Sequence, residues 1–447
     1  MSYTINKDLN NRPIKLHSGK GVWLHDEFGN KILDACGGVA VSSLGHCHPD
    51  ITQALSANAG MLSWAHAGSF TSNAAEQLGE FLIKRSNGLG KVQFLSGGSE
   101  AIEVSMKVAY QFHCENGQPN RRCFISRRQS YHGSTFAALS LSGNPGRRSV
   151  FSPLLSFNNH FVSACNAYRG KLDNETDEDY VNRLAIELDN KIMELGPENV
   201  AAFIFEPVVG STCGAVPAVK GYMKSMKDVC ERHGVLLILD DVMSGMGRTG
   251  SLYSHLDHGM LPDIVAVGKG LAAGYQPISA YLITDQIHDT LARGSGILGN
   301  GQTHVNHPYA CQIALAVQQV IERDQLLENA RQRGKQMRQL FAESLADIEY
   351  VGDIRGQGFF LGIEFVANKE TKQPLLRSAE FVRTLKQEAL SKNLLLYPGS
   401  GTADGTLGNH LLFAPPFITS SEEVEEMVGR TVELIRQMDT NFKKWSK

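Results

Sequence analysis

Short apolar runs and longer amphipathic stretches alternate through the middle of the chain. The apolar runs are short enough to be strands buried on both faces of a sheet. They cover residues 92–95, 123–126, 160–162, 201–205, 235–239, 264–267 and 278–283. Helical patterns fall between most of them, as at 99–112 and 221–233. This alternation predicts an α/β fold with a mostly parallel, doubly wound, seven-stranded sheet flanked by helices.

The N-terminal part has a different pattern. Two short alternating runs at 21–24 and 31–34 are separated by a polar, glycine-containing turn. Such runs predict a small antiparallel meander. We expect residues 1–55 to form part of a small α+β domain beside a large domain made by residues 56–325.

The C-terminal part, residues 326–447, is expected to complete the small domain. One long helix is predicted at about 308–345, leading from the large domain into this part. Strands near 358–365 and 410–413 flank a helix near 378–392. The last helix is predicted to begin at a capping box, Ser420 followed by Glu423. Its expected apolar stripe is Val424, Met427, Val428, Thr431, Ile435 and Met438.

Composition excludes several classes of protein. The 447 residues are 42% hydrophobic and carry a net charge of -3, which gives no electrostatic basis for binding nucleic acid or an anionic membrane. No apolar run approaches the ~20 residues of a membrane span, and residues 1–13 do not have the pattern of a leader peptide. The eight cysteines form no CxxC pair, which fits a reducing compartment. A cytoplasmic protein is expected.

His46, Cys47 and His48 are the one cluster that suggests a metal site. Alternate residues of an extended segment point to opposite sides, and no second group of ligands has suitable spacing. A polar turn is therefore expected here, and no metal site.

The stretch 235–273 contains the strongest indication of chemistry. Asp240 and Asp241 directly follow one predicted strand, and Lys269 follows the next. Ligands of parallel sheets bind at the carboxyl ends of the strands. A lysine buried there has a lowered pKa and becomes nucleophilic, which suits it to forming a Schiff base.

Three further strand ends carry candidate groups. Gly98 and Ser99 open a helix after a glycine turn, where free N–H groups and the helix dipole favour a phosphate; the alternative is a turn in which Ser99 merely caps the helix. Tyr131 could stack on a planar ligand or be an ordinary buried loop residue. Glu206 could face the crevice or cap the turn that follows it.

Residues 245–250, GMGRTG, match the GxGxxG dinucleotide fingerprint, with Asp263 downstream. The match is weak because the segment after Gly250 is too short and polar for a full crossover helix. A nicotinamide-dependent dehydrogenase stays a remote alternative on this motif alone.

A phosphate site, a stacking aromatic residue, a strand-end acid and a buried lysine together indicate pyridoxal 5′-phosphate. Lys269 would hold its aldehyde. Asp240 would keep the ring nitrogen protonated, so that the ring accepts electrons.

The chain also resembles the class III (subgroup II, ω-amino acid type) aminotransferases of pyridoxal-phosphate fold type I along nearly its whole length. The matching segments are 44–49, 96–101, 131–133, 206–208, 239–242, 247–250, 262–270, 301–303 and 307–308. The resemblance identifies GMGRTG as the GxGRTG turn of that family.

The resemblance implies roles for individual residues. Lys269 would form the Schiff base and shuttle protons, and Asp240 would pair with the pyridine nitrogen. Val242 would pack on the ring face opposite Tyr131. The remaining expected cofactor contacts are Gly98, Ser99, His132, Glu206 and Thr303. The family works as homodimers with active sites at the interface, so Thr303 would reach the phosphate of the partner subunit.

The resemblance does not identify an arginine that would bind the carboxylate of the substrate. Many relatives place one shortly before the Pro415-Pro416 pair, but Gly405 and Leu412, the two expected positions, hold none. Such an arginine is a major specificity device. The substitutes considered are Arg127, Arg128 and Arg355, and the candidate substrate contacts are Trp23, Trp64 and Arg355.

The sequence therefore predicts an aminotransferase with a ping-pong mechanism. Its donor would be an amine or an ω- or β-amino acid, and its acceptor a 2-oxo acid such as pyruvate or 2-oxoglutarate. An amino acid racemase or epimerase on the same fold is the alternative, because it would use every residue named above.

Overall fold

The centre of the computed structural model, which describes residues 3–155 and 158–446, is a seven-stranded sheet. Its strands, in spatial order, are β4 (Leu89–Leu95), β12 (Ser279–Thr284), β11 (Ile264–Val267), β10 (Leu236–Asp240), β7 (Val200–Phe205), β5 (Cys123–Arg127) and β6 (Asn159–Val162). Strand β12 runs antiparallel to both of its neighbours, and all other neighbouring pairs are parallel. All seven predicted strands lie in this sheet, which confirms the mostly parallel sheet.

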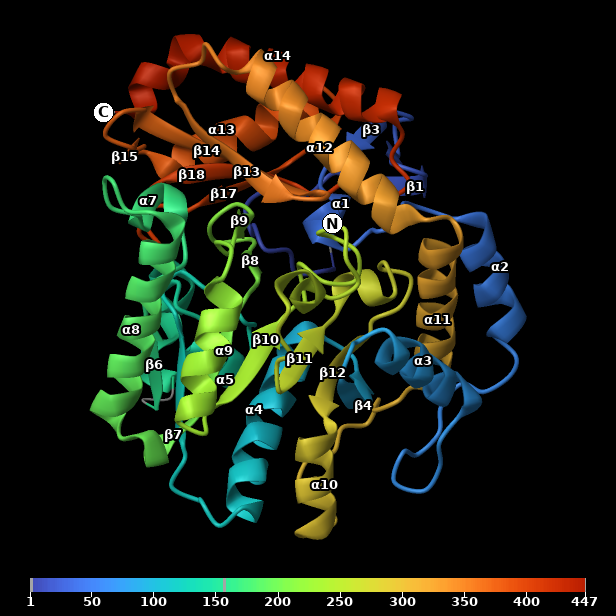
Figure 1. Cartoon of the computed structure of the whole chain (residues 1–447). Coiled ribbons are helices and arrows are strands. Elements are labelled where there is room, and N and C mark those ends of the chain that lie inside the picture. The colour runs from blue at the N-terminus through green and yellow to red at the C-terminus, as the bar shows by residue number, and fades with distance from the viewer. Residues whose placement is uncertain (1–2, 156–157, 447) are drawn as a thin grey trace.

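Helices cover both faces of this sheet (Figure 1). Successive strand residues point to opposite faces, so Ile204 and Ile238 contribute to one hydrophobic core while Phe203 and Leu237 contribute to the other. The core of Ile204 also contains residues of α4 (Gly98–Glu115). The core of Phe203 contains residues of α3 (Asn73–Lys84), α8 (Asp177–Leu195), α9 (Tyr222–Arg232) and α11 (Pro308–Arg323).

The prediction of one long helix at 308–345 is wrong. Two helices occupy that range, α11 and α12 (Leu326–Ser344). Gln325, between them, has a left-handed backbone with φ 53°. No glycine or proline marks the break in the sequence. The chain turns there because the two helices have different partners: α11 packs against α3, and α12 packs against α14 (Ser421–Trp445).

Segments from both termini build the upper part of the molecule in Figure 1. Its strands are β1 (Leu16–Lys20), β2 (Trp23–Asp26), β3 (Lys31–Asp34), β13 (Val351–Gln357), β14 (Phe360–Asn368), β15 (Gln373–Pro374), β16 (Leu394–Leu395), β17 (Tyr397–Ser400) and β18 (Asn409–Phe413). The C-terminal β16 pairs with the N-terminal β3. Val22 and Leu33 share a hydrophobic core with Phe365 and Phe413. The α+β character agrees with the predicted fold class, and the boundaries at residues 55 and 325 stay a prediction.

Helix α14 begins as expected. Ser420 Oγ accepts a hydrogen bond from the Glu423 N–H, and Glu423 Oε2 accepts one from the Ser420 N–H. The six residues of the predicted stripe, from Val424 to Met438, are all buried. This capping box and apolar face attach the helix to α12 and α13 (Ser378–Ser391).

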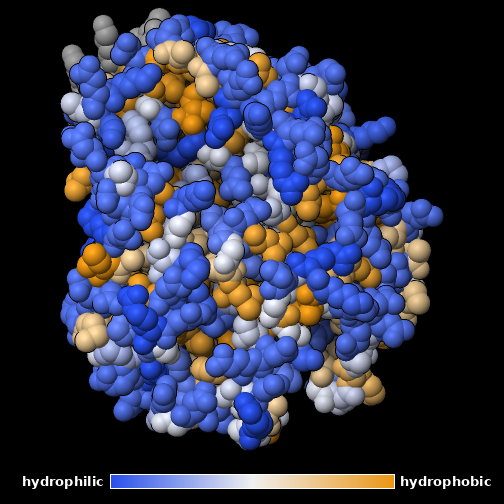
Figure 2. All heavy atoms as spheres, in the orientation of Figure 1, coloured by the Kyte–Doolittle hydropathy of each residue, from blue (hydrophilic) through white to orange (hydrophobic). Residues whose placement is uncertain are grey.

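Shorter elements join these parts. They are α1 (Gly37–Ala40), α2 (Pro49–Asn58), α5 (Phe136–Leu141), α6 (Pro145–Arg148), α7 (Ala167–Gly170), α10 (Asp285–Arg293), β8 (Val208–Val209) and β9 (Val216–Pro217). Hydrophilic atoms dominate the face shown in Figure 2, with hydrophobic atoms visible in patches between them. Among the described helices, none is both long and apolar enough to cross a bilayer.

Candidate active site

The carboxyl ends of the central strands surround a cavity of about 180 Å³. It is lined by Gly98, Ser99, Tyr131, His132, Gly133, Glu206, Val208, Ser211, Asp240, Val242, Met243 and Lys269. These residues come from four separate strand-to-turn junctions, after β4, β5, β7 and β10, and from the turn after β11. Eight of the nine residues expected to contact a cofactor are therefore brought together, and Thr303 is the exception.

Asp240 ends β10 and is 5% exposed. Its Oδ2 lies 2.7 Å from His132 Nδ1, and its Oδ1 accepts a hydrogen bond of 3.2 Å from the Val242 N–H. Both carboxylate oxygens are therefore held in position. Within the described residues, the buried Nε2 of His132 has no hydrogen-bond partner.

Glu206 directly follows β7 and is also buried. Its Oε1 accepts a hydrogen bond of 2.9 Å from the Tyr131 N–H, and its Oε2 accepts one of 3.3 Å from the Gly210 N–H. Burial raises the pKa of the Glu206 carboxyl, while nearby His132 acts to lower it. Glu206 therefore fixes the backbone of Tyr131 and places a carboxyl group at the cavity wall.

Lys269 lies in a single turn directly after β11, with a left-handed backbone at φ 41°. Burial lowers the pKa of the Lys269 amine to about 8, although the negative charges of Asp240 and Glu206 act in the opposite direction. A lysine needs its neutral form to act as a nucleophile. At a pKa near 8 a substantial fraction of the amine is neutral close to physiological pH.

The start of α4 presents backbone N–H groups at the cavity. Glu100 Oε2 accepts the N–H groups of Ser96 and Gly97, so these two donors are satisfied within the turn. The N–H groups of Gly98 and Ser99 follow them at the first turn of the helix, where the dipole favours an anion. A Cβ on Gly98 would lie 2.7 Å from Val242 Cγ1, so only glycine fits there without movement of Val242.

Ser99 also links two sides of the cavity. Its Oγ accepts a hydrogen bond of 3.0 Å from the Ser134 N–H. This bond draws the turn after Tyr131 onto the start of α4. Gly133, at φ 145°, has no room for a side chain because a Cβ there would lie 2.7 Å from Ser99 Oγ.

Thr303 lies outside the cavity lining and is exposed in the single chain. Its carbonyl oxygen accepts a hydrogen bond of 2.9 Å from Trp64 Nε1. Trp64 is itself partly exposed and does not line the cavity. Trp23, in β2, lies under the amine of Lys31 and the guanidinium of Arg430, and it too is not part of the lining.

The arginines considered as substitutes for the missing one are all engaged elsewhere. Arg355 is buried and pairs with Asp353 and Glu364. Arg127 is buried below the site, where its guanidinium donates to the Glu206 carbonyl oxygen. Arg128 is mostly exposed and pairs with Glu187.

Positions 412 and 405, where that arginine was expected, lie in different surroundings from one another. Leu412 lies in the middle of β18, paired with β14 and β17, and is fully buried. Gly405 lies in the loop before β18 with φ 91°, and a Cβ there would lie 2.3 Å from Pro145 Cδ. A side chain at 405 is therefore excluded while α6 keeps its place.

The GMGRTG segment forms a tight turn and does not open a helix. Its Arg248 is buried, stacks on Phe417 at 4.6 Å and donates to the Pro415 carbonyl oxygen. The turn thus joins the central sheet to the chain segment after β18. This is a structural contact, unlike that of a dinucleotide-binding turn.

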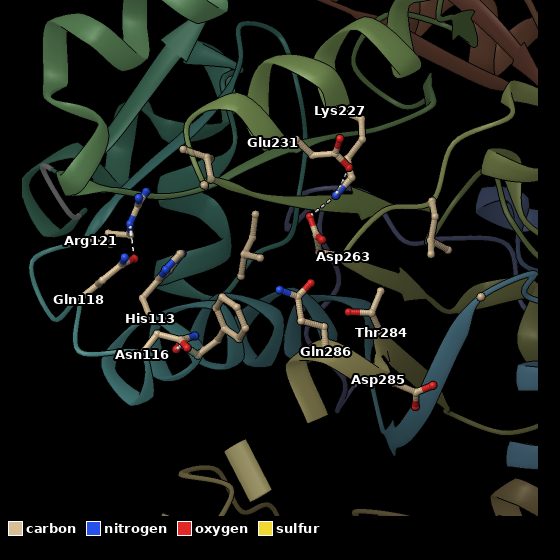
Figure 3. A pocket seen from close by; sticks show the side chains of 16 residues that line it. His113, Asn116, Gln118, Arg121, Lys227, Glu231, Asp263, Thr284, Asp285 and Gln286 are labelled. Carbon is tan, nitrogen blue, oxygen red and sulfur yellow. Dashed lines mark hydrogen bonds and ion pairs between the residues drawn. The ribbon is translucent and has the colours of Figure 1, made fainter. Parts of the chain in front are cut away.

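The position of Asp263 also argues against a dinucleotide-binding site. It precedes β11 and therefore lies at the amino edge of the sheet, whereas residues 245–250 follow the carboxyl end of β10. There its Oδ2 lies 2.8 Å from Lys227 Nζ and accepts the Leu237 N–H, in a separate, larger hollow (Figure 3). Glycine turn and acid lie at opposite edges of the sheet, so they cannot bind one nucleotide together.

Four residues of the cavity lining were not among the predicted site residues: Gly133, Val208, Ser211 and Met243. Gly133 and Val208 lie in segments that match the family, next to predicted site residues. Met243 follows the strand-end acids by two residues, so its position after β10 was a usable signal. Ser211 lies in the turn between β8 and β9, and no pattern in the sequence indicates that this turn folds back over the site.

Comparisons with known proteins agree with this geometry. A family model for class-III aminotransferases matches residues 4–435. A Gibberella zeae protein named aminotransferase is 42% identical over 96% of this chain and 84% of its own length. The uncharacterized aminotransferase YodT of Bacillus subtilis is 36% identical over 99% of both chains. The omega transaminase of Pseudomonas jessenii, solved in complex with PMP, has a TM-score of 0.91 at 29% identity, covering 99% of this chain and 97% of that one.

Proposed function

The chain belongs to the class-III aminotransferase family, and we propose that it moves an amino group from an amine or an ω- or β-amino acid to a 2-oxo acid such as pyruvate or 2-oxoglutarate. The observation that carries the proposal is the meeting of Asp240 and Lys269 in one cavity, at the ends of adjacent strands β10 and β11. The comparisons do not favour the racemase or epimerase alternative, nor the dehydrogenase.

Pyridoxal 5′-phosphate is the cofactor that the residues of this cavity fit. The start of α4 offers a phosphate the N–H groups of Gly98 and Ser99, both of which line the cavity. Lys269 offers an amine with a lowered pKa, and His132 Nε2 is a buried polar atom that lacks a partner among the described residues. When bound, this cofactor supplies an aldehyde that joins amino groups and a ring that accepts electrons.

Each polar residue then has a defined task. Lys269 would hold the aldehyde, and its Nζ, once free, would carry a proton away from the donor carbon. Asp240, fixed by His132 and Val242, would keep a proton on the ring nitrogen. Tyr131 and Val242 would pack against the ring from opposite sides, and Glu206 keeps the Tyr131 backbone in place. The donor leaves as a carbonyl compound before the 2-oxo acid enters, which is a ping-pong sequence.

A homodimer with the active site at its interface is part of the proposal. Large hydrophobic side chains are exposed in the segment between α2 and α3, among them Met61 at 78% and Phe70 at 68%. The same segment contains Trp64, whose indole holds the carbonyl of Thr303. Such exposed apolar groups are typical of a protein interface. Covering them with a second copy would bring Thr303 of one subunit to the phosphate bound in the other.

The proposed location is the cytoplasm. All eight cysteines are free, including the exposed Cys47. Free thiols persist in a reducing compartment.

Reduction with borohydride tests the function directly. Wild-type protein incubated with pyridoxal phosphate should develop a visible absorption band, and borohydride should attach the cofactor to Lys269, as read by peptide mass. Lys269→Ala should lose this adduct and all turnover of donor. Lys224→Ala is the matched control, since Lys224 is an exposed residue of α9 paired with Asp228, and it should behave as wild type. Turnover by Lys269→Ala would refute the assignment.

A further inference from the structure

Arg147, in the short helix α6, places a guanidinium beside the active-site cavity. Its Cζ lies 4.2 Å from the ring centroid of Tyr131, and its Nη2 donates a hydrogen bond of 3.1 Å to Ser211 Oγ. Tyr131 and Ser211 both line the cavity. Arg147 is itself exposed and is not part of the lining. Its guanidinium is therefore held at the rim of the cavity by two residues of the cavity wall.

This guanidinium has no carboxylate partner among residues 3–155 and 158–446. The 25 ion pairs of the described chain include Arg128, Arg169 and Arg355 but not Arg147. Its charge acts inside the site, because it adds to the effect of burial in lowering the pKa of Lys269. Arg147 thus supplies a positive charge at the site that no described acidic side chain pairs with.

The backbone of α6 is fixed where this side chain is needed. Asn144 Oδ1 accepts the Arg147 N–H at 3.1 Å and caps the helix. Pro145 closes the space beside Gly405, as described above, and a Cβ on Gly146 would lie 3.0 Å from the Gly405 carbonyl oxygen. The loop position that carries no arginine therefore lies directly against the helix that carries one.

The free edge of the guanidinium suits a carboxylate. The guanidinium carbon lies over the Tyr131 ring, and Ser211 takes one N–H donor. The other N–H groups lie in the plane of the guanidinium, the geometry that binds a carboxylate through two parallel hydrogen bonds.

We propose that Arg147 binds the carboxylate of the substrates, both of an amino-acid donor and of the 2-oxo acid acceptor. The inference builds on the proposed amino transfer and narrows its donor class: amino acids are preferred over amines that lack a carboxylate. The same guanidinium, in α6, would bind the carboxylate of the 2-oxo acid acceptor.

A matched pair of donors tests the proposal in the half-reaction of the holoenzyme, followed by the change in cofactor absorbance. In 3-aminobutanoate and butan-2-amine the amine has the same surroundings, and only the first has a carboxylate. Arg147→Gln should lower kcat/KM for 3-aminobutanoate by about 10- to 100-fold, the effect of one charged hydrogen-bonding group. It should leave butan-2-amine within about 2-fold. Arg147→Lys should recover part of the loss.

Arg148→Gln is the matched control. Arg148 is the next residue, but it donates to the Ser142 carbonyl oxygen and stacks on Phe161. The same charge is removed, yet both donors should keep their wild-type rates within about 2-fold, since Ser142 and Phe161, the partners of Arg148, do not line the cavity.

A binding measurement that needs no turnover completes the test. Calorimetric titration of the holoenzyme with butanoate should show binding that Arg147→Gln weakens by about 10- to 100-fold. Equal losses on both donors would mean that Arg147 only positions Tyr131, and that result overturns the proposal. So would unchanged butanoate binding in Arg147→Gln, or no butanoate binding by the wild type. The borohydride adduct at Lys269 tests the proposed amino transfer separately. These results would therefore contradict only the role of Arg147.

Discussion

Asp240 Oδ2 and His132 Nδ1 lie 2.7 Å apart, at the ends of two strands that are not neighbours in the sheet. Strand β7, which is followed by Glu206, separates them. This hydrogen bond joins the acid of β10 to the turn after β5 across the top of the site. It fixes the orientation of the Asp240 carboxylate, which under the proposed function would pair with the ring nitrogen of the cofactor.

Replacing Asp240 should affect the reaction more than the fold. Asp240→Asn should lower kcat by about 10²- to 10³-fold, the usual effect of removing one preorganised electrostatic group. Asp241→Asn is the matched control, because Asp241 is equally buried but accepts hydrogen bonds from Ser244 and Ser254. Asp241→Asn should instead lower the free energy of unfolding, by about 1–3 kcal/mol. Steady-state kinetics and urea unfolding of both variants separate the two effects, and a larger loss of kcat in Asp241→Asn would contradict the site.

The capture of pyridoxal phosphate by apoenzyme should depend on pH through Lys269. Its amine has a pKa of about 8, so the neutral, nucleophilic fraction grows as pH rises, and the rate of capture should increase to a plateau above pH 8. The Glu206 carboxylate raises this pKa, so Glu206→Gln should move the midpoint to lower pH. Stopped-flow absorbance between pH 6 and pH 10 measures both midpoints. A rate that still rises at pH 10 without a plateau, as expected of the ordinary lysine pKa of 10.5, would contradict the burial of the amine.

A methyl group at Gly98 should weaken binding of the cofactor phosphate. Gly98→Ala places a Cβ 2.7 Å from Val242 Cγ1, and overpacking of this kind costs about 1–3 kcal/mol. The Kd for pyridoxal phosphate should rise by about 5- to 150-fold, as measured by fluorescence titration of apoenzyme. Gly97→Ala is the control, because a Cβ there meets no atom within 4 Å. Val242→Ala should restore part of the affinity in the Gly98→Ala background.

Charges on the exposed apolar segment should dissociate the proposed dimer. Met61→Asp combined with Phe70→Asp places two carboxylates where burial in an interface would desolvate them. Sedimentation should then show monomers and activity should fall, since Thr303 would no longer reach a second site. Phe28→Asp serves as control: Phe28 is 83% exposed, in the turn between β2 and β3, on a different part of the chain. If the wild-type protein sediments as a monomer, the proposed dimer is wrong.

The capping box of α14 should contribute measurably to stability. Ser420→Ala removes the acceptor of the Glu423 N–H and should lower the free energy of unfolding by about 1 kcal/mol. Ser391→Ala, near the C-terminal end of α13, removes a hydroxyl that caps no helix start and should change stability by less than about 0.5 kcal/mol. Urea unfolding compares the two variants, and equal effects would contradict the capping role.

Local patterns predicted the central sheet well because its strands are buried on both faces. Runs such as 201–205 and 264–267 are apolar throughout, as expected of strands that are covered on both faces of the sheet. The break at Gln325 was missed because it follows from the packing of α11 and α12 on different partners, which leaves no glycine or proline in the sequence.

The sequence by itself determined which groups stand at the strand ends: Asp240, Glu206 and Lys269 each follow an apolar run, and strand direction brings such residues to one edge. Only the tertiary structure decided which of two adjacent carboxylates faces the cavity, because Asp240 meets His132 while Asp241 meets Ser254. It also decided that Arg147 lies at the cavity while Arg355 and Arg127 do not. Where a charged side chain of a loop lies depends on contacts between segments far apart in sequence. No periodicity encodes those contacts.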